Sequence, residues 1–504
     1  IDRVPVVGTA GIKRVINGPM IWSPDSNVLF GPVPELKNYF CCNGVIPGFS
    51  QSGGLGLLAA EWIIEGETKY DMFAWDVARF GAWASKEFTK SRVGDQYAHR
   101  FSIHFPNEER SAGRPVRTRP IYQMQKEMGA VMGFNYGWEH PLWFAETPGV
   151  KDTNGFTRQN WFEPVGKECK MLREKAGIID ISNFAKYVVQ GKKGRDWLDA
   201  VFANKMPTEV GRSCLTPLIS RRGGLAGDFT VTLIAQDEYW IFGSGMAERY
   251  HKRFFDSVPL PEGVRFDSRT EAVCGFNLAG PLSRKILQRL TNTSLNNADF
   301  QFMRSKYAEL AGIDVKMLRV SFTGDLGWEV HCNTADQKAL YTALLEAGKE
   351  FGAGPVGSRA LMAMRVEKGY GSWSREYSPE YWPHEQGMDR LCKMDKDFLN
   401  KAALQAVLAQ EPREQMVLLH LNEAAVTASN ADATGGEPVF KDGNGIGRVT
   451  SGAYGYSVGL SLALAMVKDV GPGDEVEVMV LGQPHKAKIL HQPPFDPTGK
   501  KLRA

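Results

Sequence analysis

The sequence lacks any apolar run close to the roughly 20 residues that a membrane-spanning helix needs. Its first residues also lack the order of positive charge, apolar stretch and cleavage site that defines a signal peptide. There is no initiator Met, so we expect the chain to begin inside a longer product. These absences predict a protein that does not insert into a membrane.

Several catalytic and metal-binding motifs are missing as well. The seven cysteines are odd in number and without CxxC spacing, so we expect neither a disulfide framework nor a zinc site, and a reducing, intracellular compartment. The nine histidines are scattered without ligand spacing, and the GxxxxGK[ST], HExxH and GxSxG motifs are absent. Phosphoryl transfer, zinc hydrolysis and nucleophile-elbow chemistry are therefore disfavoured.

Charge is nearly balanced, with 60 basic and 57 acidic side chains and a formal net charge of +3. This balance excludes the basic footprint of a nucleic-acid-binding protein and favours a small-molecule substrate. A chain of 504 residues with 43% hydrophobic residues is long enough for several cores. Its length predicts about three domains.

The pattern of elements changes twice along the chain. A polar stretch at 147–160 predicts a domain boundary, and from 161 to about 400 predicted helices alternate with strands, as in a mixed α+β domain. Residues 406–415 form a predicted linker. The short apolar runs that follow, separated by Gly, Asp and Pro, are typical of a small β-barrel or sandwich.

A glycine-rich segment with Gly53, Gly54 and Gly56 is predicted to form a loop that runs into a helix. Together with Ala59 it matches GxGxxA, the dinucleotide fingerprint, and Asp71 or Asp76 lies about where a ribose-binding acid is expected. The strand that should directly precede this fingerprint is missing, which argues against a Rossmann unit.

Residues 18–80 as a whole, with this segment inside them, resemble the C-terminal end of FAD-dependent amine oxidoreductases of the sarcosine and dimethylglycine dehydrogenase type. Residues 99–144 resemble their central linking domain. In that family the glycine-rich loop approaches the flavin, so the resemblance implies that Gly53, Gly54 and Gly56 contact FAD. Glycines let backbone N–H groups come close to a polar ligand. The alternative is a turn that only allows the helix to pack.

Five further segments resemble the glycine cleavage T-protein family in order: 173–191, 211–242, 322–332, 357–371 and 381–404. This resemblance implies a tetrahydrofolate site. Asp228 matches the family's carboxylate beside folate N5 and N10, which assists one-carbon transfer by positioning the amine and stabilising developing positive charge. The alternative for Asp228 is a residue that caps a turn.

Three more residues are implied to bind folate. Glu329 matches the carboxylate that accepts two hydrogen bonds from the pterin 2-amino and N3–H groups, and Arg359 matches an arginine near the same ring. The T-protein motif Tyr-Thr-Gly-Glu is replaced here by Phe322-Thr-Gly-Asp325. Phe322 can still stack on the pterin ring, but it has no hydroxyl group. Leu215 also replaces a tyrosine. Glu329 and Arg359 are otherwise read as surface residues.

We therefore expect a multidomain α+β protein. It would have the end of an FAD-dependent oxidoreductase domain (1–90), a linking domain (91–150), a T-protein-like folate-binding domain (151–404) and a C-terminal β-barrel (405–504). The resemblance implies oxidative demethylation of a small N-methylated amino acid by FAD, with transfer of the one-carbon unit to tetrahydrofolate. Electron-transfer flavoprotein is a possible partner, and a bacterial cytoplasm or a mitochondrial matrix the expected location. Two alternatives stay open: a folate-dependent methyl- or aminomethyltransferase without flavin oxidation, and a non-catalytic folate-binding regulatory protein.

Overall fold

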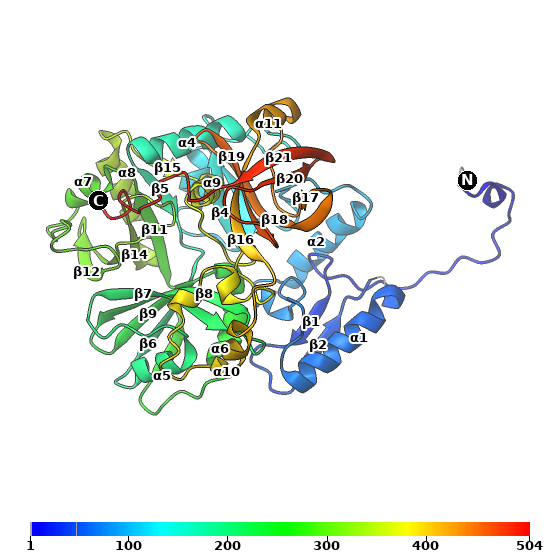
Figure 1. Cartoon of the computed structure of the whole chain (residues 1–504), viewed down its shortest axis with the longest axis horizontal. Coiled ribbons are helices and arrows are strands. Elements are labelled where there is room, and N and C mark those ends of the chain that lie inside the picture. The colour runs from blue at the N-terminus through cyan, green and yellow to red at the C-terminus, as the bar shows by residue number, and fades with distance from the viewer. Residues whose placement is uncertain (1–2, 47) are drawn as a thin grey trace.

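The computed structural model describes residues 3–46 and 48–504 (Figure 1). Residues 3–21 are exposed and extend away from the rest of the molecule, with one short 3-10 helix, η1 (Pro5–Gly8). Among the described residues, every helix is too short or too polar to traverse a lipid bilayer.

The N-terminal unit is a two-stranded ribbon, β1 (Leu29–Pro32) and β2 (Phe40–Asn43), against which α1 (Gly48–Glu65) packs. Trp62 of α1 lies over Gly31, where a Cβ would come within 2.8 Å of the Trp62 ring. The backbone of Gly31 also has a φ of +108°, so only glycine suits this contact. The helix is thereby fixed to the ribbon.

The predicted glycine-rich loop is wrong, because Gly53, Gly54 and Gly56 lie inside α1. All three are exposed, and a Cβ built on any of them meets nothing within 4 Å. Leu55, Leu58 and Trp62 anchor this stretch to the ribbon by burying apolar surface, which outweighs the weak helix propensity of the glycines.

A linking region of short elements follows. It contains η2 (Val77–Arg79), α2 (Lys86–Ala98), α3 (Tyr122–Glu127) and the paired strands β3 (Ala130–Asn135) and β4 (Trp138–Phe144). Ile121 is fully buried in the main core of the next domain, and Trp143 of β4 is buried against a second core there. This end of the linking region is therefore packed into the next domain. The boundaries expected near residues 90, 150 and 404 stay predictions.

The next domain is built on two antiparallel-rich sheets. The first is five-stranded, in the order β10 (Arg265–Ser268), β6 (Ala185–Gln190), β9 (Glu238–Gly243), β8 (Leu225–Ala235) and β7 (Arg212–Ile219). The second is six-stranded, in the order β12 (Ser305–Leu310), β13 (Ile313–Leu318), β14 (Gly327–Asn333), β11 (Val273–Ala279), β5 (Gly177–Asp180) and β15 (Gly354–Val356). The α+β prediction for this domain is confirmed.

Helices cover the outer faces of the two sheets. The first sheet is flanked by α5 (Gly194–Val201) and α6 (Glu248–Asp256), and the second by α7 (Ser283–Gln288) and α8 (Gln337–Lys349). Two further helices, α4 (Phe162–Glu174) and α9 (Ser358–Glu367), contribute to the second core, the one that contains Trp143. The remaining 3-10 helices are η3 (Gly245–Ala247), η4 (Thr334–Asp336), η5 (Pro383–Glu385) and η6 (Asp389–Leu391).

The C-terminal unit is a closed barrel, as expected. After α10 (Lys401–Leu408), its strands run β16 (Gln415–Leu421), β19 (Leu460–Val467), β18 (Asn444–Gly455), β17 (Pro438–Lys441), β20 (Glu475–Val480) and β21 (Gln483–Ile489), with α11 (Glu423–Ser429) beside them. In Figure 1 the barrel lies beside α4 and α9 in the upper half of the view, while β7, β8 and β9 lie in the lower half. Closure pairs every strand and leaves no open edge.

Candidate functional site

Asp228 lies within strand β8, directly opposite Pro217 of β7. Because directly opposed residues of an antiparallel pair share a sheet face and alternate residues repeat it, Thr230 and its partner Leu215 lie on the same face as Asp228. Phe242 of β9 is opposite Thr230 on the other side and also belongs to this face. Asp228 therefore stands on the face turned away from the helices that cover the first sheet.

Glu329 lies in strand β14, directly opposite Asn277 of β11. His331, two residues further on, shares this face of the second sheet, and its Nε2 donates to a carboxylate oxygen of Glu329 at 3.3 Å. The alternate residues of the same strands are buried in the core under α7 and α8. Glu329 thus also points away from the helical layer.

The two faces meet at a ring contact. Phe242 stacks on His331 with ring centroids 4.6 Å apart and an interplanar angle of 26°. Apolar residues of both sheets, including Val188 and Leu318, form a small core around this contact. Asp228 and Glu329 are consequently carried by facing sheets. We call their surroundings the inter-sheet site: Asp228, Leu215, Thr230, Phe242, Asn277, Glu329 and His331.

The electrostatics of Asp228 suit an acid–base group. Asp228 is half-buried, and its carboxylate forms no ion pair within residues 3–46 and 48–504. Burial raises the pKa of Asp228 to about 6. Tyr377 packs with Phe73, Tyr250 and Trp373. Its pKa is raised mainly by burial and, to a smaller extent, by the nearby Asp228 carboxylate. An unpaired carboxylate with such a pKa exchanges a proton readily near neutral pH.

The structure adds residues that the sequence did not single out. Lys186 is fully buried opposite Phe242 in β6, its ammonium group donates to the carbonyl oxygens of Ser182 at 3.1 Å and Phe184 at 2.9 Å, and burial lowers its pKa to about 7. Burial also lowers the pKa of His331. The signal that could have found Lys186 and Asn277 is a polar residue inside an otherwise apolar strand.

Phe322 lies between β13 and β14, in the segment that leads to Glu329. Its ring stacks on Tyr370, with centroids 6.0 Å apart and an interplanar angle of 17°. Asp325, three residues later, is buried in an ion pair with Arg173 and accepts a hydrogen bond from Thr323 at 3.1 Å. Asp325 therefore stabilises the turn between β13 and β14 through contacts with other residues of the chain.

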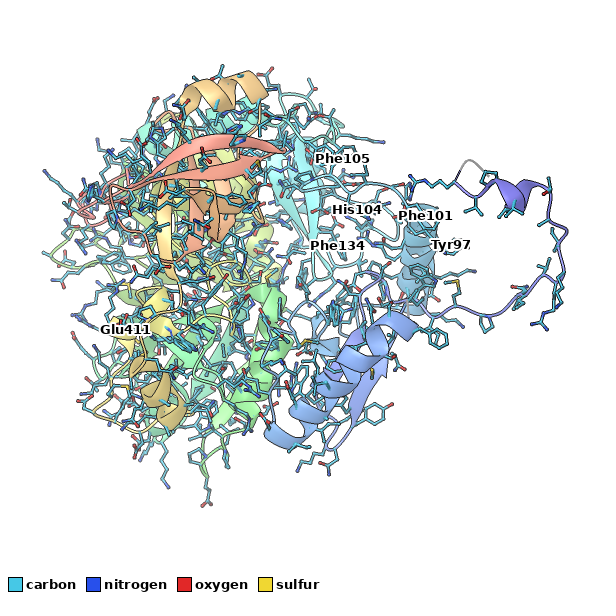
Figure 2. The ribbon with its side chains drawn as sticks, turned by 45° about the vertical axis from the view of Figure 1, so that its right-hand side comes forward. Tyr97, Phe101, His104, Phe105, Phe134 and Glu411 are labelled. Atoms are coloured by element: carbon cyan, nitrogen blue, oxygen red, sulfur yellow. The ribbon has the colours of Figure 1, made fainter. Side chains whose placement is uncertain are left out.

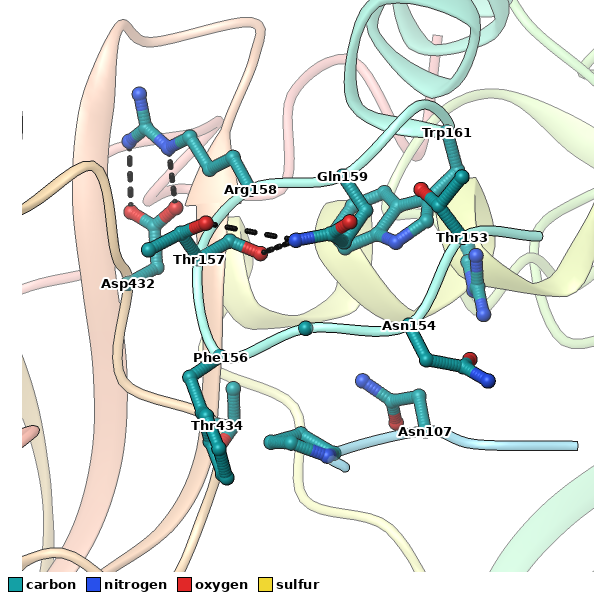
Figure 3. Close-up of a pocket in the computed structure, with 13 residues that line it drawn as sticks. Asn107, Thr153, Asn154, Phe156, Thr157, Arg158, Gln159, Trp161, Asp432 and Thr434 are labelled. Carbon is teal, nitrogen blue, oxygen red and sulfur yellow. Dashed lines mark hydrogen bonds and ion pairs between the residues drawn. The ribbon is translucent and has the colours of Figure 1, made fainter. Parts of the chain in front are cut away.

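Arg359 has its ion-pair and ring partners, Asp152 and Trp161, outside the inter-sheet site. It lies in the first turn of α9, where its guanidinium donates to both carboxylate oxygens of Asp152, at 2.6 and 3.0 Å, and lies over the Trp161 ring. It lines a small cavity of about 50 Å³ formed mainly by residues 153–159 (Figure 3). Within the described part of the chain, no ion pair or hydrogen bond joins Arg359 to Glu329 or Asp228.

Comparison with models of known families shows which family this chain belongs to. The family model of the GCVT N-terminal domain matches residues 121–396, more than half of the chain. The chain belongs to the GCVT family. Two further models match: the FAD dependent oxidoreductase central domain over 65–118, and the glycine cleavage T-protein C-terminal barrel domain over 415–496. The expected combination of modules in this GCVT-family chain is thereby confirmed.

Curated relatives extend over the same length of chain. Dimethylglycine dehydrogenase from Mus musculus, a mitochondrial protein, is 34% identical over 98% of this chain and 57% of the relative. Sarcosine dehydrogenase from the same organism, also mitochondrial, is 28% identical over 100% of this chain and 60% of the relative. The predicted resemblance to these dehydrogenases is confirmed. The chain spans less than two thirds of their length.

A solved structure shows the same fold. The crystal structure of the glycine cleavage system aminomethyltransferase T from Bartonella henselae aligns with a TM-score of 0.65 at 21% identity, covering 76% of this chain and 98% of that one. At this identity the likeness concerns the fold. It shows that the two sheets and the barrel of this GCVT-family chain form the architecture of a T-protein.

Proposed function

We propose that this chain is the folate-binding part of an FAD-dependent enzyme that demethylates a small N-methylated amino acid of the dimethylglycine or sarcosine type. The one-carbon unit passes to tetrahydrofolate. The observation that carries the proposal is the inter-sheet site, where Asp228 and Glu329 stand on facing sheets. The relatives support it because they carry these names and align with nearly the whole chain.

The residues of the inter-sheet site fit a reduced pterin. Glu329 keeps some of its side chain exposed and offers two acceptor oxygens, which match the 2-amino and N3–H donors of the ring. Asn277 beside it has a buried amide oxygen without a hydrogen-bond partner in the described residues. Leu215 supplies an apolar surface on the opposing sheet, 46% exposed. A polar edge and an apolar wall are what a flat heterocycle requires.

Asp228 is the proposed catalytic residue. Tetrahydrofolate supplies the N5 and N10 nitrogens that take up the one-carbon unit. With a pKa of about 6, Asp228 is mostly ionised at pH 7.5 and can hold an N–H proton or stabilise positive charge next to it. Strand β8 is paired with β7 on one side and β9 on the other, which keeps the carboxylate fixed.

The flavin part of the proposal concerns α1. Its outward side exposes Phe49, Leu57, Ile63 and Ile64, next to Gly53, Gly54 and Gly56, and Tyr97 and Phe101 are exposed in the linking region (Figure 2). Soluble proteins seldom leave so many large apolar side chains together in water. We propose that an FAD-binding portion, with the flavin near the glycines, covers this side. Transfer of electrons to electron-transfer flavoprotein, and a mitochondrial matrix or bacterial cytoplasmic location, belong to the same proposal.

The second candidate is a folate-dependent aminomethyltransferase without flavin oxidation, favoured by the T-protein architecture. A visible absorption spectrum of the intact protein, including any portion encoded upstream, separates the two. The demethylase proposal expects a flavin band that is bleached by dimethylglycine or sarcosine. A colourless protein that still binds tetrahydrofolate would support the transferase and overturn the demethylase.

Titration with tetrahydrofolate tests the folate site itself. We expect Glu329→Gln to weaken binding about 10- to 100-fold, because it replaces two charge-assisted hydrogen bonds. Glu475→Gln, which changes an exposed glutamate in barrel strand β20, is the matched control and should bind like the parent. If the parent protein does not bind tetrahydrofolate, both candidates fail, and so does a non-catalytic folate-binding regulator.

A further inference from the structure

Asn277 is a polar residue inside a fully buried strand. All seven residues of β11 are buried, and Asn277 is only 3% exposed. Its Nδ2 donates to the carbonyl oxygen of Val320 at a long 3.4 Å, while its Oδ1 has no hydrogen-bond partner among the described residues. Folded proteins rarely leave a buried amide oxygen unpaired, so an acceptor at this position points to a missing donor.

The position of Asn277 indicates where that donor comes from. The residue is directly opposite Glu329, and the two side chains share one sheet face. Val320, which receives its Nδ2 hydrogen bond, lies two residues before Phe322. The amide therefore lies between the Glu329 carboxylate and the segment that carries Phe322. The neighbouring side chain His331 already contacts Glu329 and Phe242.

We propose that Asn277 is a second pterin-binding residue that distinguishes reduced from oxidised folate. This inference rests on the proposed folate site. When Glu329 accepts from the 2-amino and N3–H groups, N1 and N8 of the pterin form the adjoining edge. In tetrahydrofolate N8 carries a hydrogen and donates, whereas in fully oxidised folate N8 is an acceptor. Asn277 Oδ1 accepts from N8–H in the first case and repels N8 in the second.

Paired titrations of the full chain with tetrahydrofolate and with folic acid test this assignment. Replacing Asn277 by leucine keeps the side-chain volume and removes the acceptor. We expect Asn277→Leu to bind tetrahydrofolate about tenfold more weakly, the size of one lost hydrogen bond, while its affinity for folic acid stays the same or rises. The ratio of the two dissociation constants is the decisive readout, because a purely structural role would change both alike.

Two further variants complete the test. Thr232→Val is the matched control: Thr232 is buried on the facing sheet, but its hydroxyl is already hydrogen-bonded to Ser305, so the ratio should equal that of the parent. Asn277→Asp keeps the acceptor oxygen and should retain the preference for the reduced form, which keeps the test open if the leucine variant does not fold. An unchanged ratio in Asn277→Leu, or loss of the preference in Asn277→Asp, overturns the inference.

Different results would contradict the folate site and the role of Asn277. A parent protein that binds neither folate overturns the proposed folate site and this inference with it. A parent that binds tetrahydrofolate and loses affinity in Glu329→Gln, but not in Asn277→Leu, overturns the role of Asn277 alone. A double variant that loses less than the sum of the two single changes supports a shared ligand.

Discussion

Phe242 and His331 stack with their ring centroids 4.6 Å apart, and this contact joins the sheet that carries Asp228 to the sheet that carries Glu329. Neither ring was expected to matter for binding. Both are buried, and they belong to strands whose neighbouring residues bring the two carboxylates onto facing surfaces. The geometry of the site therefore depends on an aromatic ring contact as well as on the carboxylates themselves.

Removing that contact should loosen the site. We expect Phe242→Ala to lower the free energy of unfolding by about 3–5 kcal/mol, because it deletes a buried ring, and to weaken tetrahydrofolate binding as well. Urea unfolding and a folate titration measure the two effects. Phe440→Ala in barrel strand β17 is the control, which should cost stability but leave folate affinity of the folded protein unchanged. Equal folate affinity in both variants would contradict the role of the contact.

The raised pKa of Asp228 predicts a dependence of stability on pH. Its folded-state pKa of about 6 lies above the ordinary value of 3.8, so the folded state binds the proton more tightly. Its contribution to stability therefore falls as the pH rises from about 4 to above 6. Asp228→Asn removes this cost, and at pH 8 we expect a gain of about 1–3 kcal/mol that disappears near pH 4. Urea unfolding of both proteins at the two pH values checks this.

The same variant should lose one-carbon transfer to tetrahydrofolate, because an amide cannot accept the proton. A difference in stability that is equal at pH 4 and pH 8 would show that the effect does not come from ionisation of Asp228. Retained transfer would show that the carboxylate is not the catalytic group.

Leu215 offers a gain-of-function prediction. It is 46% exposed and shares the Asp228 face of the first sheet. A tyrosine there adds an aromatic surface and a hydroxyl, so we expect Leu215→Tyr to bind tetrahydrofolate about three- to tenfold more tightly. Leu260 has the same exposed fraction of 46% in a loop elsewhere, and Leu260→Tyr should have no effect. Equal affinities in both variants would place folate away from this face.

Replacing Arg359 should change the stability of the protein more than its affinity for tetrahydrofolate. Arg359→Met leaves the carboxylate of Asp152 without its bidentate partner, and we expect a loss of about 2–3 kcal/mol in the free energy of unfolding. Tetrahydrofolate affinity should change less than threefold. Thermal or urea unfolding and a folate titration measure both quantities. A large loss of affinity in a normally stable variant would instead support a role of Arg359 at the pterin site.

Much of the architecture follows from the sequence. The motifs between residues 173 and 404 predict the T-protein fold through their resemblance to that family. Each motif corresponds to a strand, turn or helix that residues close together in the sequence specify. The short apolar runs after residue 415 predict a barrel for the same reason. Asp228 and Glu329 were predicted as site residues from the family resemblance of these motifs.

Tertiary structure decided the rest. The segment around Gly54 is helical because Leu55 and Trp62 bury apolar surface on the β-ribbon, a long-range gain that outweighs the local preference of glycine for turns. Arg359 pairs with Asp152, more than 200 positions earlier in the chain. Asn277 faces Glu329 only through the register of two strands that are distant in sequence. Local patterns specify which residues form strands, but only packing and register determine which strands meet and which side chains share a site.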